Sequence, residues 1–313
     1  MSVLAICASH TPLKDHAEPA PGVRDEVDAC FARLRAEVAV FQPELVLVFG
    51  PDHYNCFFHR LMPSFCLGAE TASVGDWNTP AVALPGDPAL AEAAAAFAHR
   101  AGVDLALSYR MEVDHGHTQT LQLLLAWDDL PPVLPVFINC VGAPRPPLAR
   151  VAALGHALGE FISGLGKRVL VLGSGGLSHD PPVPSLPSAP PEVRERLIAG
   201  GAVAPEVRAA RQRRVIEEGK RQAAGDAANA VPLNPAWDEA FLAALVRQDL
   251  LALTRYTDDD ITRDGGRGGH EIRAWVAVAA AMSALAAGAP KVEFYRAIPE
   301  WIAGFGVLTQ RAS

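Results

Sequence analysis

The chain has 313 residues, which is the length of one large domain or two small ones. Hydrophobic residues make up 50% and charged residues 20%, so the chain can bury a sizeable core and wholesale disorder is excluded. The formal net charge is -8. This is the wrong sign for a protein that binds a phosphate backbone, so we expect no nucleic-acid partner.

Short runs rich in Val, Leu and Ile predict buried strands. They are apolar on both faces rather than alternating, as in a largely parallel sheet covered by helices. In chain order these runs are Val3–Ala8, Leu45–Phe49, Val133–Ile138 and Arg168–Leu172, with a strand or hairpin at Phe57–Leu67 and a weaker strand at Leu105–Tyr109.

Helical patterns alternate with these strands. An Asp or Asn followed by Pro marks the start of two helices, at Asp87-Pro88 and Asn234-Pro235, and Gly102 ends the first of them. The predicted helices cover Arg24–Phe41, Pro88–Gly102, Gln119–Trp127, Leu148–Leu165, Val193–Ala224, Trp237–Arg247 and Trp275–Ala289. The alternation predicts one α/β domain over 1–313, with a mostly parallel or mixed central sheet covered by helices.

Cysteine usage and the apolar segments bear on the compartment. The five cysteines are scattered, form no C-x-x-C pair and fit free thiols in a reducing cytosol. The first residues lack the basic stretch of a signal peptide. The longest apolar segment, Trp275–Ala289, is shorter than the ~20 residues that cross a bilayer. We therefore expect a cytoplasmic protein without a membrane partner.

Four of the ten histidines share one kind of position. His10, His53 and His179 each follow a predicted strand, and His115 follows the weaker strand at Leu105–Tyr109. Because ligands bind at the carboxyl ends of strands in open α/β sheets, we expect these four side chains to converge there. His117 lies so near His115 that it is either a further site residue or part of a helix start.

Other catalytic motifs are absent, but one acid remains a candidate. The glycines at 173–176 lack the Lys-Ser/Thr of a P-loop, and His270-Glu271 has Ala274 where a zincin needs its second His. Glu271 stands at the start of an apolar helix, where an acid is also favoured by the helix dipole. With two histidines it would complete the 2-His-1-carboxylate set typical of non-haem Fe(II).

Several motifs in order resemble one enzyme family, the class III (LigB-type) extradiol ring-cleavage dioxygenases. The resemblance runs nearly end to end and is weakest at 184–229 and 254–269. The motifs are Ala8-Ser9-His10-Thr11-Pro12, Pro51-Asp52-His53-Tyr54-Asn55, Val113-Asp114-His115-Gly116, Gly173-Ser174-Gly175-Gly176-Leu177-Ser178-His179 and Pro299-Glu300-Trp301-Ile302-Ala303-Gly304-Phe305-Gly306.

The resemblance implies a role for each of these residues. It makes His10, His53 and Glu271 the ligands of Fe(II), His115 the proton donor and His179 the proton acceptor. Residues expected to line or shape the substrate pocket are Asp114, Pro181, Asp52, Tyr54, Asn55 and Trp301.

The resemblance also implies a substrate and an assembly. It favours members that use O2 to cleave a 3-substituted catechol, such as 3-(2,3-dihydroxyphenyl)propionate or 2,3-dihydroxycinnamate, and that form homo-oligomers. The side-chain carboxylate of such a substrate needs a cationic or hydrogen-bonding partner, for which Arg273 and Arg296 are both possible. An acidic chain must then keep a local positive site, which its total charge does not reveal.

Two alternatives stay open at the level of sequence. The same histidines could hold Zn(II) in a hydrolase, with a metal-bound water as the nucleophile. Some relatives of such a fold instead keep part of the histidine set and act as binding or signalling proteins. The four histidines together with a candidate carboxylate favour an enzyme.

Overall fold

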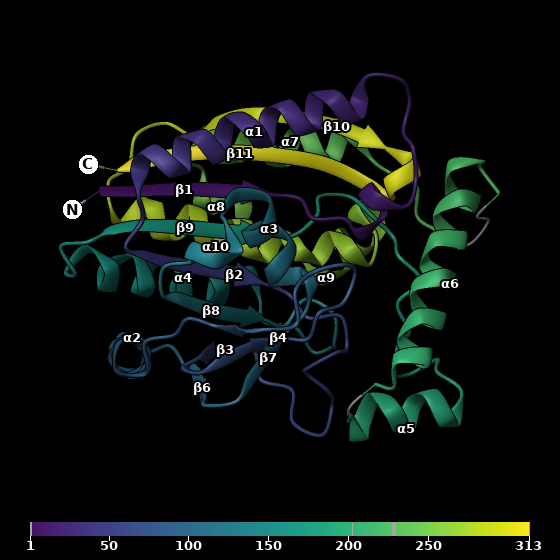
Figure 1. The fold of residues 1–313 in the computed structure, drawn as a ribbon, viewed down its shortest axis with the longest axis horizontal. Coiled ribbons are helices and arrows are strands. Elements are labelled where there is room, and N and C mark those ends of the chain that lie inside the picture. Colours follow the sequence, from purple (N-terminus) through teal and green to yellow (C-terminus); the bar gives the residue numbers. More distant parts are fainter. Residues whose placement is uncertain (1, 202, 227–229, 313) are drawn as a thin grey trace.

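A computed structural model describes residues 2–201, 203–226 and 230–312. Its centre is an eight-stranded mixed sheet with the order β10-β11-β1-β9-β2-β8-β3-β6 (Figure 1). The strands are β1 (Ser2–Ala8), β2 (Leu45–Gly50), β3 (Phe65–Gly68), β6 (Ala106–Ser108), β8 (Val133–Ile138), β9 (Arg168–Ser174), β10 (Lys291–Ile298) and β11 (Ala303–Ala312). The four strands β1, β9, β2 and β8 run parallel, so their carboxyl ends share one edge.

Helices cover both faces of this sheet, which confirms the predicted α/β fold. Alternate residues of β1 enter different cores, Val3 and Ala5 on one face and Leu4 and Ile6 on the other. The first face packs against α2 (Pro88–Arg100), α4 (Leu148–Ser163), α7 (Pro235–Val246), α8 (Leu250–Leu253), α9 (Asp258–Gly265) and α10 (Ile272–Ala284). The second face packs against α1 (Val23–Phe41) and α3 (His115–Leu124).

Three helix predictions need correction, the simplest being Trp275–Ala289, where α10 begins at Ile272 and ends at Ala284. The segment Val193–Ala224 is not one helix but two, α5 (Pro191–Ala199) and α6 (Pro205–Ala223), because Gly200 adopts a positive φ of 69° and ends the first. The helix expected at Gln119–Trp127 begins four residues earlier, at His115, where the Asp114 side chain caps it by accepting the N–H of Gly116.

One strand prediction needs correction, and one pair of strands was missed. In Phe57–Leu67 only the end of the segment is a strand, β3, after Pro63. The C-terminal hairpin of β10 and β11 was not predicted, although β11 is buried between β10 and β1. Polar residues such as Gln310 interrupt its apolar pattern.

His115 reaches the site by a different route from the one expected. β6 runs antiparallel to β8, through β3, so its carboxyl end lies at the opposite edge. The chain returns through β7 (Met111–Val113), which belongs to a small second sheet with β4 (Thr71–Ser73) and β5 (Ala83–Leu84). This return places His115 beside the carboxyl ends of the main sheet.

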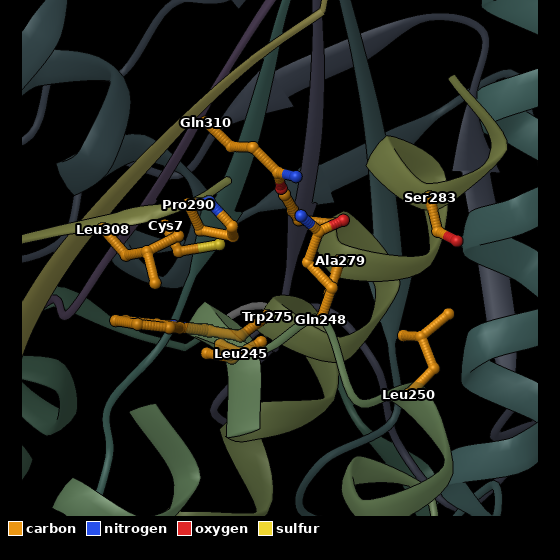
Figure 2. A pocket seen from close by; sticks show the side chains of 11 residues that line it. Cys7, Leu245, Gln248, Leu250, Trp275, Ala279, Ser283, Pro290, Leu308 and Gln310 are labelled. Atoms are coloured by element: carbon orange, nitrogen blue, oxygen red, sulfur yellow. The ribbon is translucent and has the colours of Figure 1, made fainter. Parts of the chain in front are cut away.

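One pocket of the fold carries no catalytic chemistry. Figure 2 shows this pocket between α10 and the C-terminal strand, and its lining contains no histidine or carboxylate.

Among the described residues, no helix is long and apolar enough to span a bilayer.

The contact between α4 and α10 generates a prediction. A methyl group at Gly155 would overlap the carbonyl oxygen of Ala277, because the two helices meet backbone to backbone. Gly155→Ala should destabilise the fold by about 1–3 kcal/mol, measured as a lowered Tm in thermal unfolding. At Gly164 an added methyl group meets only the Phe161 oxygen, at 3.6 Å, so Gly164→Ala is the matched control. Equal Tm values for the two variants would contradict this packing.

Candidate metal centre and active site

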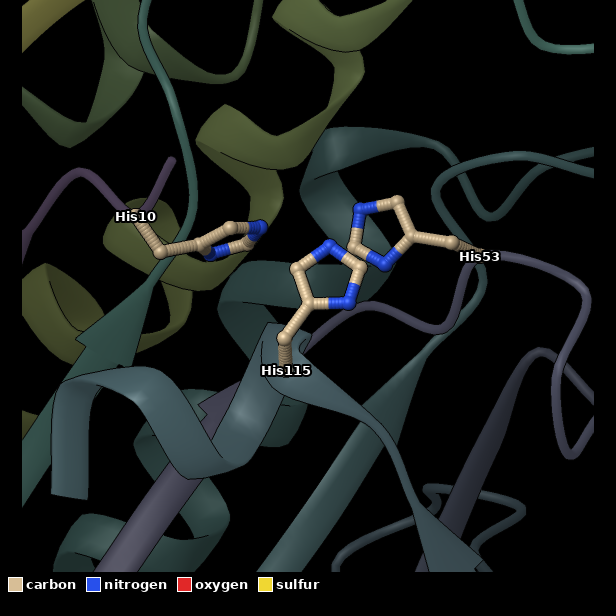
Figure 3. Close-up of side chains that lie close together, drawn as sticks. All are labelled: His10, His53 and His115. Atoms are coloured by element: carbon tan, nitrogen blue, oxygen red, sulfur yellow. The ribbon is translucent and has the colours of Figure 1, made fainter. Parts of the chain in front are cut away.

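Four histidines and one glutamate meet at the carboxyl edge of the sheet, as the sequence predicted. Figure 3 shows the rings of His10, His53 and His115 turned toward one another. Ligand atoms of these three lie within 4.8 Å of each other. Glu271 joins them, with Oε1 3.1 Å from His53 Nε2 and Oε2 3.7 Å from His10 Nε2. Its Oε1 also lies 3.5 Å from Nε2 of His179.

His10 is held as a neutral imidazole. Its Nδ1 lies 3.1 Å from the hydroxyl of Ser174 at the end of β9, and that hydroxyl lies 2.6 Å from the one of Thr120. Burial lowers the pKa of His10 to about 3. In the tautomer in which Nδ1 donates to the Ser174 hydroxyl, Nε2 presents a lone pair, which is what a metal ligand requires.

His53 is oriented by the carboxylate of Asp114. Oδ2 of Asp114 accepts the backbone N–H of His53 at 2.9 Å and lies 3.1 Å from Nδ1 of its ring. Burial opposes protonation of His53, but Asp114 and Glu271 outweigh it and raise its pKa well above the ordinary value. A cation is therefore favoured at this position, and a metal would replace the proton.

His115 has its own carboxylate partner, Asp76, which sequence reasoning missed. Asp76 accepts the backbone N–H of His115 at 2.8 Å with one oxygen and lies 2.6 Å from Nδ1 with the other. Asp76 lies in the segment after β4, where no strand-end or helix pattern marks it. Its pairing leaves Nε2 of His115 as the free ring nitrogen.

His179 is fixed through its backbone. Its N–H donates to the carbonyl of Gly265, and its own carbonyl accepts the N–H of Gly268, both at 2.9 Å. Gly268 must lack a side chain because an added methyl group would overlap the His179 ring. The next residue, Asp180, binds Arg267 with both oxygens, at 2.7 and 3.0 Å. These contacts hold the His179 loop against the segment that leads to Glu271.

Glu271 precedes α10 and lies among these histidines with 2% of its surface exposed. Oε2 accepts the backbone N–H of Gly176 at 2.8 Å. Burial opposes ionisation, but His179 and His10 outweigh it and lower the pKa of Glu271 well below the ordinary value. Glu271 is thus an anion at the centre of the cluster.

The balance of charge fits a divalent cation. Three buried carboxylates at this edge contact histidines, those of Asp76, Asp114 and Glu271. Across the described chain none of them forms an ion pair with Lys or Arg, and histidines are their only cationic partners. Buried charges without partners cost several kcal/mol, so a metal ion among these nitrogen and oxygen donors would offset that cost. The residues present are therefore compatible with a metal ion.

The three pocket candidates near His53 make different contacts. Asn55 donates to Asp114 at 2.8 Å and so supports the orientation of His53. Asp52 accepts three backbone N–H groups, those of residues 55, 56 and 57, and shapes the loop. Burial and the charge of Asp114 raise the pKa of Asp52 to about 7. The Tyr54 hydroxyl lies 2.9 Å from Nε2 of His59, outside the histidine cluster.

The remaining candidates lie at the periphery or in the core. Pro181 is half-buried beside Asp180. Trp301 is buried, and its indole N–H donates to the carbonyl of Ala17, which ties down the segment after His10. His117 is buried, and burial lowers its pKa to about 4. Its Nε2 lies 3.4 Å from the Val136 carbonyl, and no ion pair of the cluster among the described residues includes it, so we interpret His117 as structural.

Neither arginine suggested for a substrate carboxylate is free to bind one. Arg273 is buried and donates to Asp258, to Nδ1 of His270 and to the carbonyl of Pro146. Arg296 lies on β10, half-exposed, in an ion pair with Glu26. Both side chains are therefore already paired with groups of the protein.

The fold and this histidine cluster together define a class of protein. Residues 4–306 match the family model of the catalytic LigB subunit of aromatic ring-opening dioxygenase. The chain belongs to this family, and it is an aromatic ring-cleaving dioxygenase by class. The resemblance drawn from the sequence motifs is confirmed, and the hydrolase and signalling alternatives lose their support.

Particular relatives agree over the whole length. Three are named 2,3-dihydroxyphenylpropionate/2,3-dihydroxicinnamic acid 1,2-dioxygenase. The relative from Cupriavidus pinatubonensis is 49% identical, covering 98% of both chains. The relative from Paraburkholderia xenovorans is 50% identical over 99% of this chain and 98% of its own. The relative from Escherichia coli is 46% identical over 97% of each.

A solved structure agrees with the fold alone. The crystal structure of an uncharacterized protein from Escherichia coli K12 aligns with a TM-score of 0.55 at 14% identity and covers 99% of each chain. At this identity the likeness concerns the arrangement of the elements and not the chemistry.

The environment of Asp114 generates a prediction. This carboxylate orients His53, and replacing such a partner of a ligand histidine lowers metal affinity about 10–100-fold. Asp114→Asn should show that loss when divalent metal binding is titrated under anaerobic conditions. Asp129→Asn, at an exposed carboxylate, is the matched control. Unchanged affinity in Asp114→Asn would mean that His53 does not need this partner or does not bind the metal.

Proposed function

We propose that the chain carries out Fe(II)-dependent extradiol cleavage of a 3-substituted catechol such as 3-(2,3-dihydroxyphenyl)propionate or 2,3-dihydroxycinnamate. The observation that carries the proposal is the meeting of His10, His53 and Glu271 beside two further histidines, in a chain of this family. The names of relatives that are 46–50% identical over nearly the whole chain support the substrate class.

In this proposal His10, His53 and Glu271 hold the metal. The set of His10, His53 and His115 is the geometric competitor. The carboxylate is favoured because it contacts both His10 and His53 and carries a buried negative charge that a cation would balance. Three protein ligands on one side leave positions open, and bound Fe(II) would supply the sites at which a catecholate and O2 can lie together.

The two remaining histidines differ in a way that suits opposite proton-transfer roles. Nδ1 of His179 lies 3.1 Å from the carbonyl of Leu177, which can only accept, so this nitrogen carries the hydrogen and Nε2 can accept a proton. Nδ1 of His115 instead donates to the carboxylate of Asp76 at 2.6 Å, which orients the ring with Nε2 toward the cluster. We therefore assign His179 as the base that takes a catechol proton and His115 as the acid that assists ring cleavage.

The activity is tested by reconstitution. Protein purified without oxygen and loaded with Fe(II) should take up O2 and form a yellow ring-opened product when substrate and air are added. An oxygen electrode and visible absorbance record the two signals, and Zn(II)-loaded protein is the control. No oxygen uptake with any of several catechols, with and without a side-chain carboxylate, would overturn the proposal.

Substitutions separate the metal ligands from the proton carriers. His115→Gln and His179→Gln should retain iron by elemental analysis but lower kcat about 10²–10⁴-fold. His10→Ala and His53→Ala should lose the metal. His156→Gln, at an exposed residue of α4, should change neither property. Loss of iron from His115→Gln with retention in Glu271→Gln would instead favour the competing ligand set.

The setting of the enzyme also remains a proposal. We propose one catalytic domain over 1–313 that acts on a small aromatic acid and O2 in the cytoplasm. The full-length match to the family, 4–306, supports the single domain. Assembly into a homo-oligomer stays a prediction, which light scattering of the purified protein would test.

A further inference from the structure

Four arginines gather on the hairpin of α5 and α6, namely Arg196, Arg208, Arg211 and Arg214. Figure 1 shows α6 beside the end of the sheet toward which β1 and β2 point. Within the described chain, no carboxylate forms an ion pair with any of the four, although the protein as a whole is acidic. Like charges that lie together without opposite charges raise the free energy of the unliganded protein. A bound anion would lower it.

The helix α6 runs between two segments of the chain, one that supports His115 and one that follows His179. Near its start, Arg208 donates to the carbonyl of Val74 at 2.8 Å, two residues before the Asp76 that holds His115. Near its end, the Gln222 side chain donates at 3.0 Å to the carbonyl of Asp180, the residue that follows His179. The face of α6 that carries these two contacts therefore looks toward the segments that position the site.

Arg211 lies on this inner face. Positions 208, 211, 215, 219 and 222 follow one another at three- and four-residue spacing and form one stripe. Val215 packs against the second core, and an added methyl group at Gly219 would lie 2.8 Å from Leu13. Arg211 thus stands between the anchored Arg208 and the packed Val215.

Each of the two guanidinium groups on this face has a buried nitrogen without a protein acceptor. Nε of Arg208 and Nε of Arg211 are buried and have no hydrogen-bond partner among the described residues. Burial, together with Arg196, Arg208 and Arg214, lowers the pKa of Arg211 from its ordinary value. A buried donor without an acceptor is costly, and a carboxylate is the group whose geometry a guanidinium matches best.

We infer that Arg211, with Arg208 beside it, binds the side-chain carboxylate of the substrate and selects catechols that carry one. The inference rests on the proposed ring cleavage and names the part of the chain that sets its substrate class. It also supplies the local positive site that an acidic chain needs for an anionic substrate, which neither Arg273 nor Arg296 provides.

The test compares two substrates that differ only in charge at the side-chain end. These are 3-(2,3-dihydroxyphenyl)propionate and 3-propylcatechol. A charged hydrogen bond is worth roughly 1.5–3 kcal/mol, so Arg211→Met should lower kcat/KM for the first substrate about 10–100-fold, through KM. The rate with 3-propylcatechol should not change. Arg213→Met, on the exposed side of the same helix, should behave as the parent enzyme with both substrates.

The outcomes separate this inference from the proposed function. Loss confined to the carboxylate substrate supports the inference, whereas equal loss with both substrates, or no loss, overturns it. Failure of the parent enzyme to cleave either catechol overturns the proposed function itself. If Arg211→Met does not fold, judged by its circular dichroism, Arg211→Gln and Arg208→Met are run through the same comparison and read by the same rule.

Discussion

Buried negative charge is the constraint on which the rest of this structure depends. Asp76, Asp114 and Glu271 lie inside the protein with histidines as their only cationic partners among the described residues. Each is also tied to backbone N–H groups, at His115, at His53 and Gly116, and at Gly176. The carboxylates therefore fix the loops as well as the rings, and the site keeps its shape through the same interactions that make it compatible with a cation.

The sheet supplies this arrangement with a rigid base. Four parallel strands end at one edge, where the chain places His10 and His53 just beyond two of them and the supporting hydroxyl of Ser174 on the last residue of a third. The close contact of α4 with α10 sets the position of Glu271, because α10 begins at the next residue. The packing of α4 against α10, away from the histidine cluster, is thus linked through α10 to the position of the Glu271 carboxylate.

The sequence predicted the convergence because its signal is local. A histidine after an apolar run is visible without any structure, and three of them, His10, His53 and His179, follow strands that end at one edge. Asp76 escaped notice because it acts across 39 residues from a segment without pattern. The C-terminal hairpin was missed because Gln310 and Arg311 weaken its apolar run. The arginines of α6 resembled an ordinary solvated face, since periodicity shows which residues share a stripe but not what the stripe faces.

The hairpin of α5 and α6 has a consequence for how such an enzyme can diversify. The histidine cluster lies at the sheet edge, whereas the arginines lie on a separate excursion of the chain between β9 and α7. The excursion contacts the rest of the chain at Val74 and Asp180, among other places. Substitutions on α6 can alter which ring substituent is accepted while the histidines and carboxylates stay in place. Enzymes that share this fold can thereby come to accept different substrates while the residues for ring cleavage stay the same.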